Sequence, residues 1–396
     1  MHYKNDTKKY LKFNILTFLV LSVLLYPSIF VQKVNADFEV SNTSLAHEVY
    51  NSAWEKINEK FYFRSKLHLN SLKNKFEQKI NDLNDAHKYI NKLIKELDDP
   101  YTRFLTKEEF KDEQDVINSA FIGIGIKLSN TKPIILDVLP DSPASKEGLK
   151  PNDYILKVDN KSTHFLSTNK IVNLLRGPKD SIITIQIKRE KEIFTKTLKR
   201  KELHFNSVTA KLLDNEIALV KIDSFIPENT STLFKDKIIK LMSAGGLIID
   251  LRNNSGGLLK NAIEIADMFL SEGRIVTTVY NSNKINEYAN SSKLSDSKII
   301  LLVNENTASA SEILASALKE NNRALVIGKR TFGKGLVQEI VKLPDDSALH
   351  VTIAAYLTPK GNYINKIGLI PDEIISSEET QLERAKEILQ TRIASL

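Results

Sequence analysis

Residues 247–257 have the sequence Leu-Ile-Ile-Asp-Leu-Arg-Asn-Asn-Ser-Gly-Gly. The first five residues form a short apolar run typical of a buried strand, and the polar, glycine-ended remainder is typical of a loop. Apolar residues then recur at helical spacing over 258–270. The same order returns downstream, where an apolar run at 299–303 precedes a helical pattern at 309–320. Alternating strands and helices of this kind predict an α/β core.

Two other patterns precede this core. All 14 glycines lie after residue 122, and residues 45–110 carry apolar side chains at helical spacing, so a helical subdomain is expected first. Between 120 and 201 the pattern changes to short β-rich runs, interrupted by one helical stretch at 167–175. The sequence therefore predicts an α+β multidomain fold, with a helical subdomain at 37–118, a β-rich domain with a capping helix at 119–202, and the α/β core at 203–396.

The first 36 residues have the features of an export signal. Lys4, Lys8, Lys9 and Lys12 precede an apolar stretch at 13–31, and Val-Asn-Ala follows at positions 34–36. Small residues at both key positions favour cleavage of this signal peptide after Ala36, although a stretch of this length also suffices for an uncleaved N-terminal membrane anchor. In either case the chain after residue 37 lies outside the cytoplasm. A bacterial periplasm or cell envelope and a thylakoid lumen fit equally well.

Composition excludes several classes of chemistry. The 396 residues include no cysteine, so the chain has no thiol nucleophile, disulfide or cysteine-ligated metal. Its net charge is +7, but the first 36 residues hold five lysines and one acid, which leaves +3 on the remainder. The densest basic cluster is Lys199, Arg200 and Lys201, and no basic block has interleaved aromatic residues. We therefore expect no nucleic-acid partner.

Two familiar kinds of site are also excluded. The seven histidines are scattered without an H-x-x-x-H pair, and no G-x-S-x-G motif occurs, so neither a metal site nor a Ser-His-Asp hydrolase is expected. Residues 328–334 match the phosphate-loop pattern G-x-x-x-x-G-K, but Gly335 stands where that loop requires serine or threonine. If the chain is an enzyme, its base is therefore expected to be a lysine or a carboxylate.

The stretch 306–312 joins the predicted strand at 299–303 to a helix. Ser309 and Glu312 have the spacing of a capping box, which is an ordinary helix start. The same position suits a nucleophile, because free backbone N–H groups and the positive end of the helix dipole can stabilise an oxyanion there. Lys334, in a glycine-rich turn, is the candidate base, provided that its surroundings favour the neutral amine. From these residues alone both interpretations stay open.

The motifs together resemble the carboxyl-terminal processing (tail-specific) proteases, which are serine endopeptidases with a Ser-Lys dyad and an inserted PDZ domain. The resemblance extends from Trp54 to Asp372 and begins with Leu-Asp-Asp-Pro-Tyr-Thr-Arg-Phe-Leu at positions 97–105. The other matching segments are 123–125, 141–144, 148–153, 249–257, 307–312, 328–335, 358–361 and 368–372. Each segment is short, but their order and spacing are specific to the family.

The resemblance implies that Ser309 is the nucleophile and Lys334 the general base. Gln338 is similar to a residue that orients the lysine in some members, and its spacing of four residues from Lys334 puts both side chains on one face of a strand or helix. In the implied reaction, Ser309 Oγ attacks a peptide carbonyl, the lysine passes the proton to the leaving amine, and water resolves the acyl-enzyme. No metal or cofactor is required.

The implied oxyanion hole consists of the backbone N–H of Ala310 and that of Gly256 or Gly257. Glycine lets the backbone approach a substrate closely, which is also its ordinary role in a turn. Family members often have proline where this chain has Ser255. We expect this difference to affect the loop and not the dyad.

A PDZ domain at 119–202 would bind the substrate's C-terminal tail as an added strand. The resemblance places its carboxylate at the backbone N–H groups of the segment Phe121, Ile122, Gly123, Ile124 and Gly125. Arg176, at the end of the predicted helix 167–175, resembles an arginine that senses substrate and activates the protease. The residues after it differ from the family pattern, since Lys179-Asp180-Ser181 stands where Gly-Thr is usual.

The expected partners are protein substrates, bound through their C-terminal tails. The helices between 45 and 110 are candidates for homodimer contacts, and an adaptor protein is a further candidate partner. Two other functions remain open. The first is a non-catalytic PDZ adaptor of the cell envelope that only binds the C-terminal tails of other proteins, and the second is a structural envelope protein that dimerises. Both dyad residues are present, which disfavours the adaptor.

Overall fold

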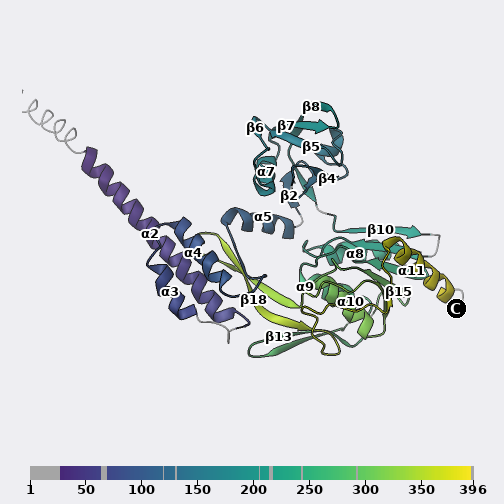
Figure 1. The fold of residues 1–396 in the computed structure, drawn as a ribbon. Helices are drawn as coiled ribbons and strands as arrows, with labels where there is room; N and C mark the ends of the chain where they lie inside the picture. Colours follow the sequence, from purple (N-terminus) through teal and green to yellow (C-terminus); the bar gives the residue numbers. More distant parts are fainter. Residues whose placement is uncertain are drawn as a thin grey trace, which may run out of the picture. The chain divides into compact units, whose positions relative to one another are not determined.

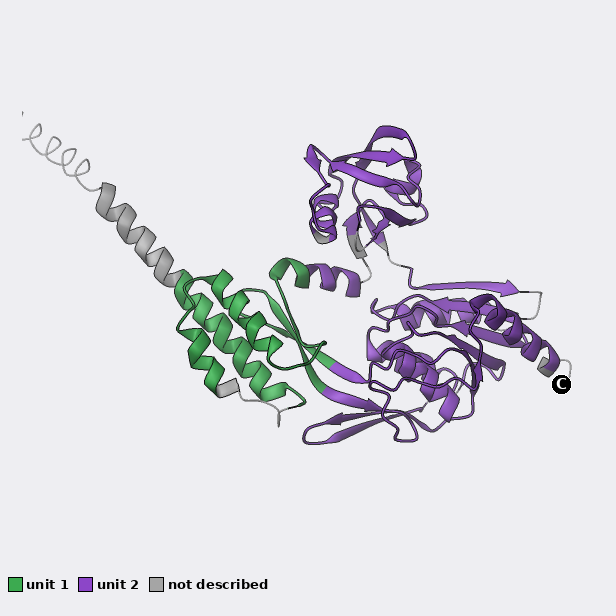
Figure 2. Ribbon diagram, viewed as in Figure 1, with its two compact units in different colours: residues 1–110, 338–353 green, residues 111–337, 354–396 purple. Residues whose placement is uncertain are grey.

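The computed structural model divides the chain into two compact units, one of residues 1–110 with 338–353 and the other of residues 111–337 with 354–396 (Figure 2). The structure describes residues 27–63, 69–118, 120–129, 132–204, 206–213, 217–241, 244–290 and 293–393. Most of the predicted signal sequence therefore lies outside the described residues. Within the described residues, no helix is both long enough and apolar enough to cross a membrane.

The core of unit 1, in its described residues, is formed by the helices α2 (Pro27–Lys60), α3 (Leu69–Glu77) and α4 (Leu83–Lys95). Helix α4 begins at the N-cap Asp82, whose side chain accepts a hydrogen bond from the Asp85 amide, and it buries one apolar stripe. Its stripe packs with α2 around Tyr50, Ile57, Ile90 and Leu93. A helical subdomain was expected here, and these helices form it.

Unit 1 also contains strands from distant parts of the chain. Strand β17 (Leu336–Lys342) and strand β18 (Ala348–Leu357) form a hairpin, and Leu349 and Val351 of β18 join the helical core. Strand β1 (Arg103–Leu105) pairs antiparallel with β18, with Phe104 opposite Leu349. This hairpin supplies apolar surface that the short helices need, so residues 338–353 belong with the N-terminal helices and not with the sheet that precedes them.

In unit 2 the expected PDZ region has short sheets around its own core (Figure 1). Its four-stranded sheet has the order β6 (Lys161–Ser162), β5 (Tyr154–Val158), β7 (Ile182–Arg189), β8 (Glu192–Lys199). The remaining strands pair as β2 (Ala120–Gly123) with β9 (Lys201–His204) and β3 (Ile126–Leu128) with β4 (Ile135–Val138). Helix α6 (Pro143–Lys146) is short, and α7 (Thr168–Leu175) begins after the N-cap Ser167.

The α/β core of unit 2 is a six-stranded sheet with the order β10-β11-β12-β15-β16-β19. Strands β11 (Ile217–Ile222), β12 (Gly246–Asp250), β15 (Lys298–Val303) and β16 (Ala324–Gly328) are parallel, and so is the short β19 (Glu373–Ile374), whereas β10 (Val208–Leu213) runs antiparallel. These parallel strands are nearly continuous apolar runs because helices cover both faces of the sheet.

Alternate residues of the central strands pack on opposite helices. In β12, Leu247 and Ile249 belong to the core shared with α8 (Thr230–Ile239), α9 (Leu259–Asp267) and α10 (Ala310–Glu320). Ile248, between them, packs with Leu389 of α11 (Glu378–Ile393). This alternation follows from the pleat of a strand, and it makes the core a three-layer α/β/α arrangement.

Beside the six-stranded sheet of the core, β13 (Arg274–Tyr280) pairs with β14 (Lys284–Tyr288) and with the last residues of β18. The predicted α+β multidomain fold is confirmed. The strands predicted at 247–251 and 299–303 and the helices predicted at 258–270 and 309–320 appear within a few residues of their predicted ends. Strands β13 and β14 and helix α11 were not predicted from the sequence.

Candidate active site

Ser309 lies at a sharp turn between β15 and α10. Its backbone has φ 57° and ψ −120°, which L-residues with a Cβ rarely adopt, and only 9% of its surface is exposed. Such a conformation persists only when the surroundings enforce it, and residues of this kind cluster at functional sites. The turn places Ser309 at the N-terminus of α10, where backbone N–H groups lack helical partners.

Two loops meet at this turn because β12 and β15 are parallel neighbours, so their carboxyl ends lie at the same edge of the sheet. The Ala308 amide donates to the carbonyl of Asn254 at 3.0 Å. The Asn253 amide donates to Asn304 Oδ1, also at 3.0 Å. The glycine loop at 253–257 is thereby bonded to the segment that carries Ser309.

Glu312 connects Ser309 to the loop of Lys334. Its side chain is wholly buried, and Oε2 accepts the backbone amides of Ser309 (2.8 Å) and Lys334 (2.9 Å). Oε1 accepts the amide of Gly333 (2.8 Å) and the hydroxyl of Thr331. One carboxylate thus fixes the backbone at both predicted dyad residues. The capping bond expected from Glu312 to Ser309 is present, but its bonds to 331–334 were not foreseen.

Glycine is required where the loop passes Ser309. A Cβ on Gly256, at φ 95°, would lie 2.7 Å from the carbonyl oxygen of Ala308 and 2.8 Å from the Cβ of Ser309. A Cβ on Gly257, at φ 145°, would lie 2.1 Å from the amide nitrogen of Ile226. A side chain at either position would displace backbone, so the loop conformation depends on both glycines.

The structure distinguishes the two glycines proposed for the oxyanion hole. The Gly256 N–H donates to Asn254 Oδ1 at 2.9 Å, so this amide is already engaged. No hydrogen bond is recorded from the amides of Gly257 and Ala310 to any described residue. Of the two predicted pairs, Ala310 with Gly257 is therefore the one whose N–H groups are available.

Buried charged side chains stabilise the edge of the sheet at which the carboxyl ends of β12 and β15 lie. Asp250, at the end of β12, pairs with Arg252 at 2.7 Å, and Arg252 also donates to the Glu378 carbonyl at the start of α11. Burial acts to lower the pKa of Arg252, but the hydrogen bond and charge of Asp250 outweigh it and raise that pKa above its ordinary value. The Glu378 side chain accepts from Asn304. Helix α11, absent from the sequence prediction, thus helps to hold both loops.

Gln338 lies in β17 within unit 1, whereas Lys334 belongs to unit 2. Its Nε2 donates to Thr352 Oγ1 at 3.3 Å, and the Thr352 amide donates to Thr102 Oγ1. The Thr102 hydroxyl in turn donates to Asp99 at 2.6 Å. The structure thus links Gln338 to the motif at 97–105, and the predicted contact between Gln338 and the lysine stays a prediction.

In the PDZ region only part of the predicted segment forms a turn. Phe121 and Ile122 lie in β2, opposite Leu203 and Glu202 of β9. Gly123 ends the strand, Ile124 is buried, and Gly125 has φ 84°, where a Cβ would lie 2.3 Å from that of Ser142. The structure records no hydrogen bond from the amides of Ile124 and Gly125 to described residues. These two amides are therefore the ones available to a carboxylate.

Arg176 is the C-cap of α7 and forms an ion pair with Asp112 of α5 (Lys107–Ile117). Burial lowers the pKa of its guanidinium below the ordinary value. Arg200 belongs to the basic cluster at 199–201. It is buried and donates to the carbonyls of Leu174 (3.0 Å) and Leu175 (2.9 Å), which satisfies carbonyls at the end of α7.

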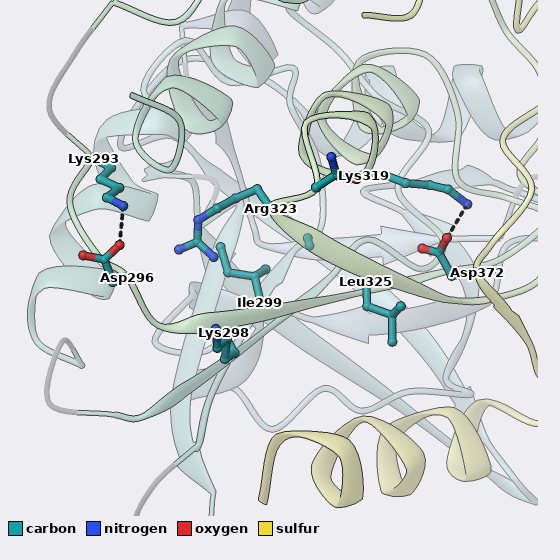
Figure 3. A pocket seen from close by; sticks show the side chains of 10 residues that line it. Lys293, Asp296, Lys298, Ile299, Lys319, Arg323, Leu325 and Asp372 are labelled. Atoms are coloured by element: carbon teal, nitrogen blue, oxygen red, sulfur yellow. Dashed lines mark ion pairs between the residues drawn. The ribbon is translucent and has the colours of Figure 1, made fainter. Parts of the chain in front are cut away.

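A pocket of about 450 Å³, whose lining Figure 3 shows, includes Lys319 near the C-terminal end of α10, whereas Ser309 precedes the N-terminal end of that helix. Two ion pairs line it, Lys293 with Asp296 and Lys319 with Asp372. Helix α10 has 11 residues, so about 16 Å separates its two ends. The pocket is therefore not part of the Ser309 site. Among the described residues, no cluster of three His, Asp or Glu side chains is able to hold a metal ion.

Comparison with known proteins identifies the family. The profile of peptidase family S41 matches residues 216–375, and a PDZ profile matches residues 134–189. The chain is 33% identical over 340 residues to a carboxyl-terminal-processing protease of Picosynechococcus sp., covering 82% of each chain. It is 36% identical to a CtpA-like serine protease of Staphylococcus haemolyticus, over 78% of this chain and 64% of that protein.

Solved structures agree with this assignment. The photosystem II D1 C-terminal processing protease matches with a TM-score of 0.59 at 29% identity, over 87% of this chain and 97% of that one. A lipoprotein from Streptococcus agalactiae shares the fold, with a TM-score of 0.55 at 14% identity. The chain therefore belongs to the PDZ-containing carboxyl-terminal-processing serine proteases of peptidase family S41, which makes it a serine-type peptidase and not only a tail-binding adaptor.

Proposed function

We propose that the chain is an exported serine endopeptidase that cuts near the C-terminus of protein substrates with Ser309 as nucleophile and Lys334 as general base. The observation that carries this proposal is the buried Glu312 carboxylate, which accepts the backbone amides of both residues. The backbones of two residues that lie 25 positions apart in the sequence are thereby hydrogen-bonded to one carboxylate. The strained backbone of Ser309 at the start of α10 supports the same assignment.

In the proposed mechanism the neutral Lys334 amine accepts the proton of Ser309 Oγ as the oxygen attacks the peptide carbonyl. The amides of Ala310 and Gly257 donate to the oxyanion of the tetrahedral intermediate. The ammonium group then protonates the leaving amine, which departs with the C-terminal fragment. Water, activated by the same lysine, hydrolyses the ester on Ser309 and restores the enzyme.

Covalent labelling tests the nucleophile directly. The chain is incubated with a fluorophosphonate, which phosphonylates activated serines, and the labelled residue is identified by peptide mass mapping. We expect one adduct, at Ser309. Because neighbouring Ser311 and Ser316 are also buried in α10, they serve as internal controls. An adduct on another serine, or none on a chain that cleaves its substrate, contradicts the assignment.

The proposed substrate determinant is a free C-terminal carboxylate. The unengaged amides of Ile124 and Gly125 lie next to β3, whose recorded ladder within the described residues is with β4 alone, so a tail could add along its other edge. Thr168, at the start of α7, donates to the Ser129 carbonyl at the end of β3, which places that helix beside the strand.

Amidation of the tail is expected to weaken binding at least about tenfold, because the charged acceptor of these hydrogen bonds is lost. The measurement is fluorescence anisotropy with one apolar tail peptide in its carboxylate and amide forms, on the Ser309→Ala variant so that no peptide is cut. Equal affinity for the two forms contradicts recognition of the carboxylate. A peptide with the same composition but scrambled order controls for non-specific apolar binding.

We further propose that the chain acts outside the cytoplasm, on the basis of the basic and apolar leader, and that it forms homodimers through the helices between 45 and 110. The domain boundaries at 37–118, 119–202 and 203–396, and a role for an adaptor, likewise remain proposals. Light scattering after size-exclusion chromatography, on the chain from residue 37, is expected to give the mass of a dimer. A monomer mass at micromolar concentration contradicts the dimer.

A further inference from the structure

Asn254, a fully buried residue of the glycine loop, is hydrogen-bonded to the turn that carries Ser309. The Asn254 Nδ2 donates to the carbonyl of Ile222 at the end of β11 (2.8 Å), and its Oδ1 accepts the amide of Gly256 (2.9 Å). Its own carbonyl accepts the amide of Ala308 and the hydroxyl of Ser311, both at 3.0 Å. One residue thus bonds to β11, to the glycine loop and to both sides of the nucleophile.

These bonds determine where the loop lies against Ser309. A Cβ on Gly256 would be 2.9 Å from the Ala310 amide nitrogen, so the loop backbone is packed directly on the start of α10. The Gly256 carbonyl also accepts a hydrogen bond from the Phe225 amide, and the Phe225 carbonyl accepts one from the Leu258 amide. With Gly256 held on both its N–H and its carbonyl, the amide that follows, that of Gly257, is the unengaged one.

We propose that Asn254 is a positioning residue for the oxyanion hole: by engaging the Gly256 amide, it holds the loop so that the Gly257 amide acts together with that of Ala310. This inference rests on the proposed role of Ser309. Only an amide side chain offers one donor and one acceptor from a side chain of this length. Donors held in place before the reaction stabilise a developing oxyanion without reorganisation, which is why their position affects rate more than substrate binding.

The test uses Asn254→Ala, which loses both side-chain bonds, and Asn254→Asp, which keeps the acceptor for Gly256. Asn321→Ala is the matched control, because the Asn321 side chain also makes two hydrogen bonds to the backbone, donating to the carbonyls of Arg274 and Ala317, but at the opposite end of α10. The readouts are kcat, KM, melting temperature and the affinity of a substrate-like peptide aldehyde. The aldehyde forms a hemiacetal with Ser309, and the chain has no cysteine to compete for it.

In Asn254→Ala we expect kcat and aldehyde affinity to fall together by roughly 10²-fold with KM little changed, the effect of losing an oxyanion donor. In Asn254→Asp we expect kcat and aldehyde affinity at least about tenfold higher than in Asn254→Ala. Asn321→Ala is expected to keep the wild-type kcat and aldehyde affinity. If Asn254→Ala does not fold, Asn254→Asp carries the test alone, with an aldehyde affinity about tenfold below wild type as the expected result.

Wild-type aldehyde affinity in any folded Asn254 variant overturns the proposal, as does a loss of activity explained entirely by a lower folded fraction. The two levels of inference remain separable. If Ser309→Ala still cleaves, the proposed nucleophile is wrong. If Ser309→Ala is inactive and the Asn254 variants bind the aldehyde like wild type, only the role of Asn254 fails.

Discussion

Ser309→Ala and Lys334→Ala are each expected to lower kcat for an unfolded reporter with an apolar C-terminal tail by at least about 10⁴-fold, because each removes one half of a unit that acts only when complete. For the same reason the double variant is expected to be no slower than either single variant. Fragments are identified by mass, so that cleavage near the C-terminus is distinguished from internal cutting. Tail binding at the PDZ domain is expected to persist.

Two further variants make this test specific. Lys334→Arg keeps a positive charge, but the guanidinium cannot give up its proton to act as a base. This variant is therefore expected to be as inactive as Lys334→Ala if the lysine acts as a base. If the lysine acted only by its charge, Lys334→Arg would retain much of the activity. Lys329→Ala and Ser316→Ala are matched controls: Lys329, in the same loop as Lys334, pairs with Glu305 of the segment after β15, and Ser316 donates to the Ile313 carbonyl within α10. Both are expected to cleave like wild type.

The contrary results are equally definite. Cleavage by Ser309→Ala at the wild-type rate rejects the nucleophile, whatever the other variants show. Loss of activity in Lys334→Ala with full activity in Lys334→Arg rejects the general base and leaves an electrostatic role. A wild-type chain that binds tails and cuts nothing would leave the protease resting under these conditions, and addition of the tail peptide as activator would then be required to produce cleavage.

The sequence predicted most of the α/β core because its elements have clear local patterns. The apolar run at 299–303 and the helix after Ser309 could be located without tertiary information, and the resemblance to the family proposed Ser309 and Lys334 as the dyad. What could not be predicted depends on contacts between distant segments. Nothing in residues 331–334 indicates that the amides of Gly333 and Lys334 meet Glu312, and the hairpin at 338–353 shows no sign in its own sequence that it packs on N-terminal helices.

Glycine and asparagine positions illustrate the same limit. Gly256 and Gly257 were equivalent candidates in the sequence, since either suits a turn. Only the bond from Gly256 to Asn254 separates them. Helix α11 was missed although Glu378 connects it to Arg252 and Asn304 and Leu389 connects it to the sheet, because its pattern is largely polar and only one narrow side is buried.

Glu312→Gln is expected to lower kcat by roughly 10² to 10³-fold while leaving tail binding unchanged, because the carboxylate positions the backbone on which both dyad residues lie. The carboxylate accepts from three backbone amides and one hydroxyl. A glutamine of the same size has one acceptor oxygen, so its amino group must face at least one backbone N–H. Each buried donor left unpaired destabilises the fold by about 1–3 kcal/mol, and a lower melting temperature is expected as well.

Loss of stability alone does not account for the expected result, and the design separates the two effects. Glu320→Gln is the control, since Glu320 ends the same helix and its carboxylate accepts the Lys360 amide and the Asn362 side chain. Rates are compared well below both melting temperatures and per active site titrated with fluorophosphonate. A folded Glu312→Gln chain that cleaves as fast as Glu320→Gln would show that Ser309 and Lys334 keep their positions without the shared carboxylate, and the observation that supports the dyad would lose its force.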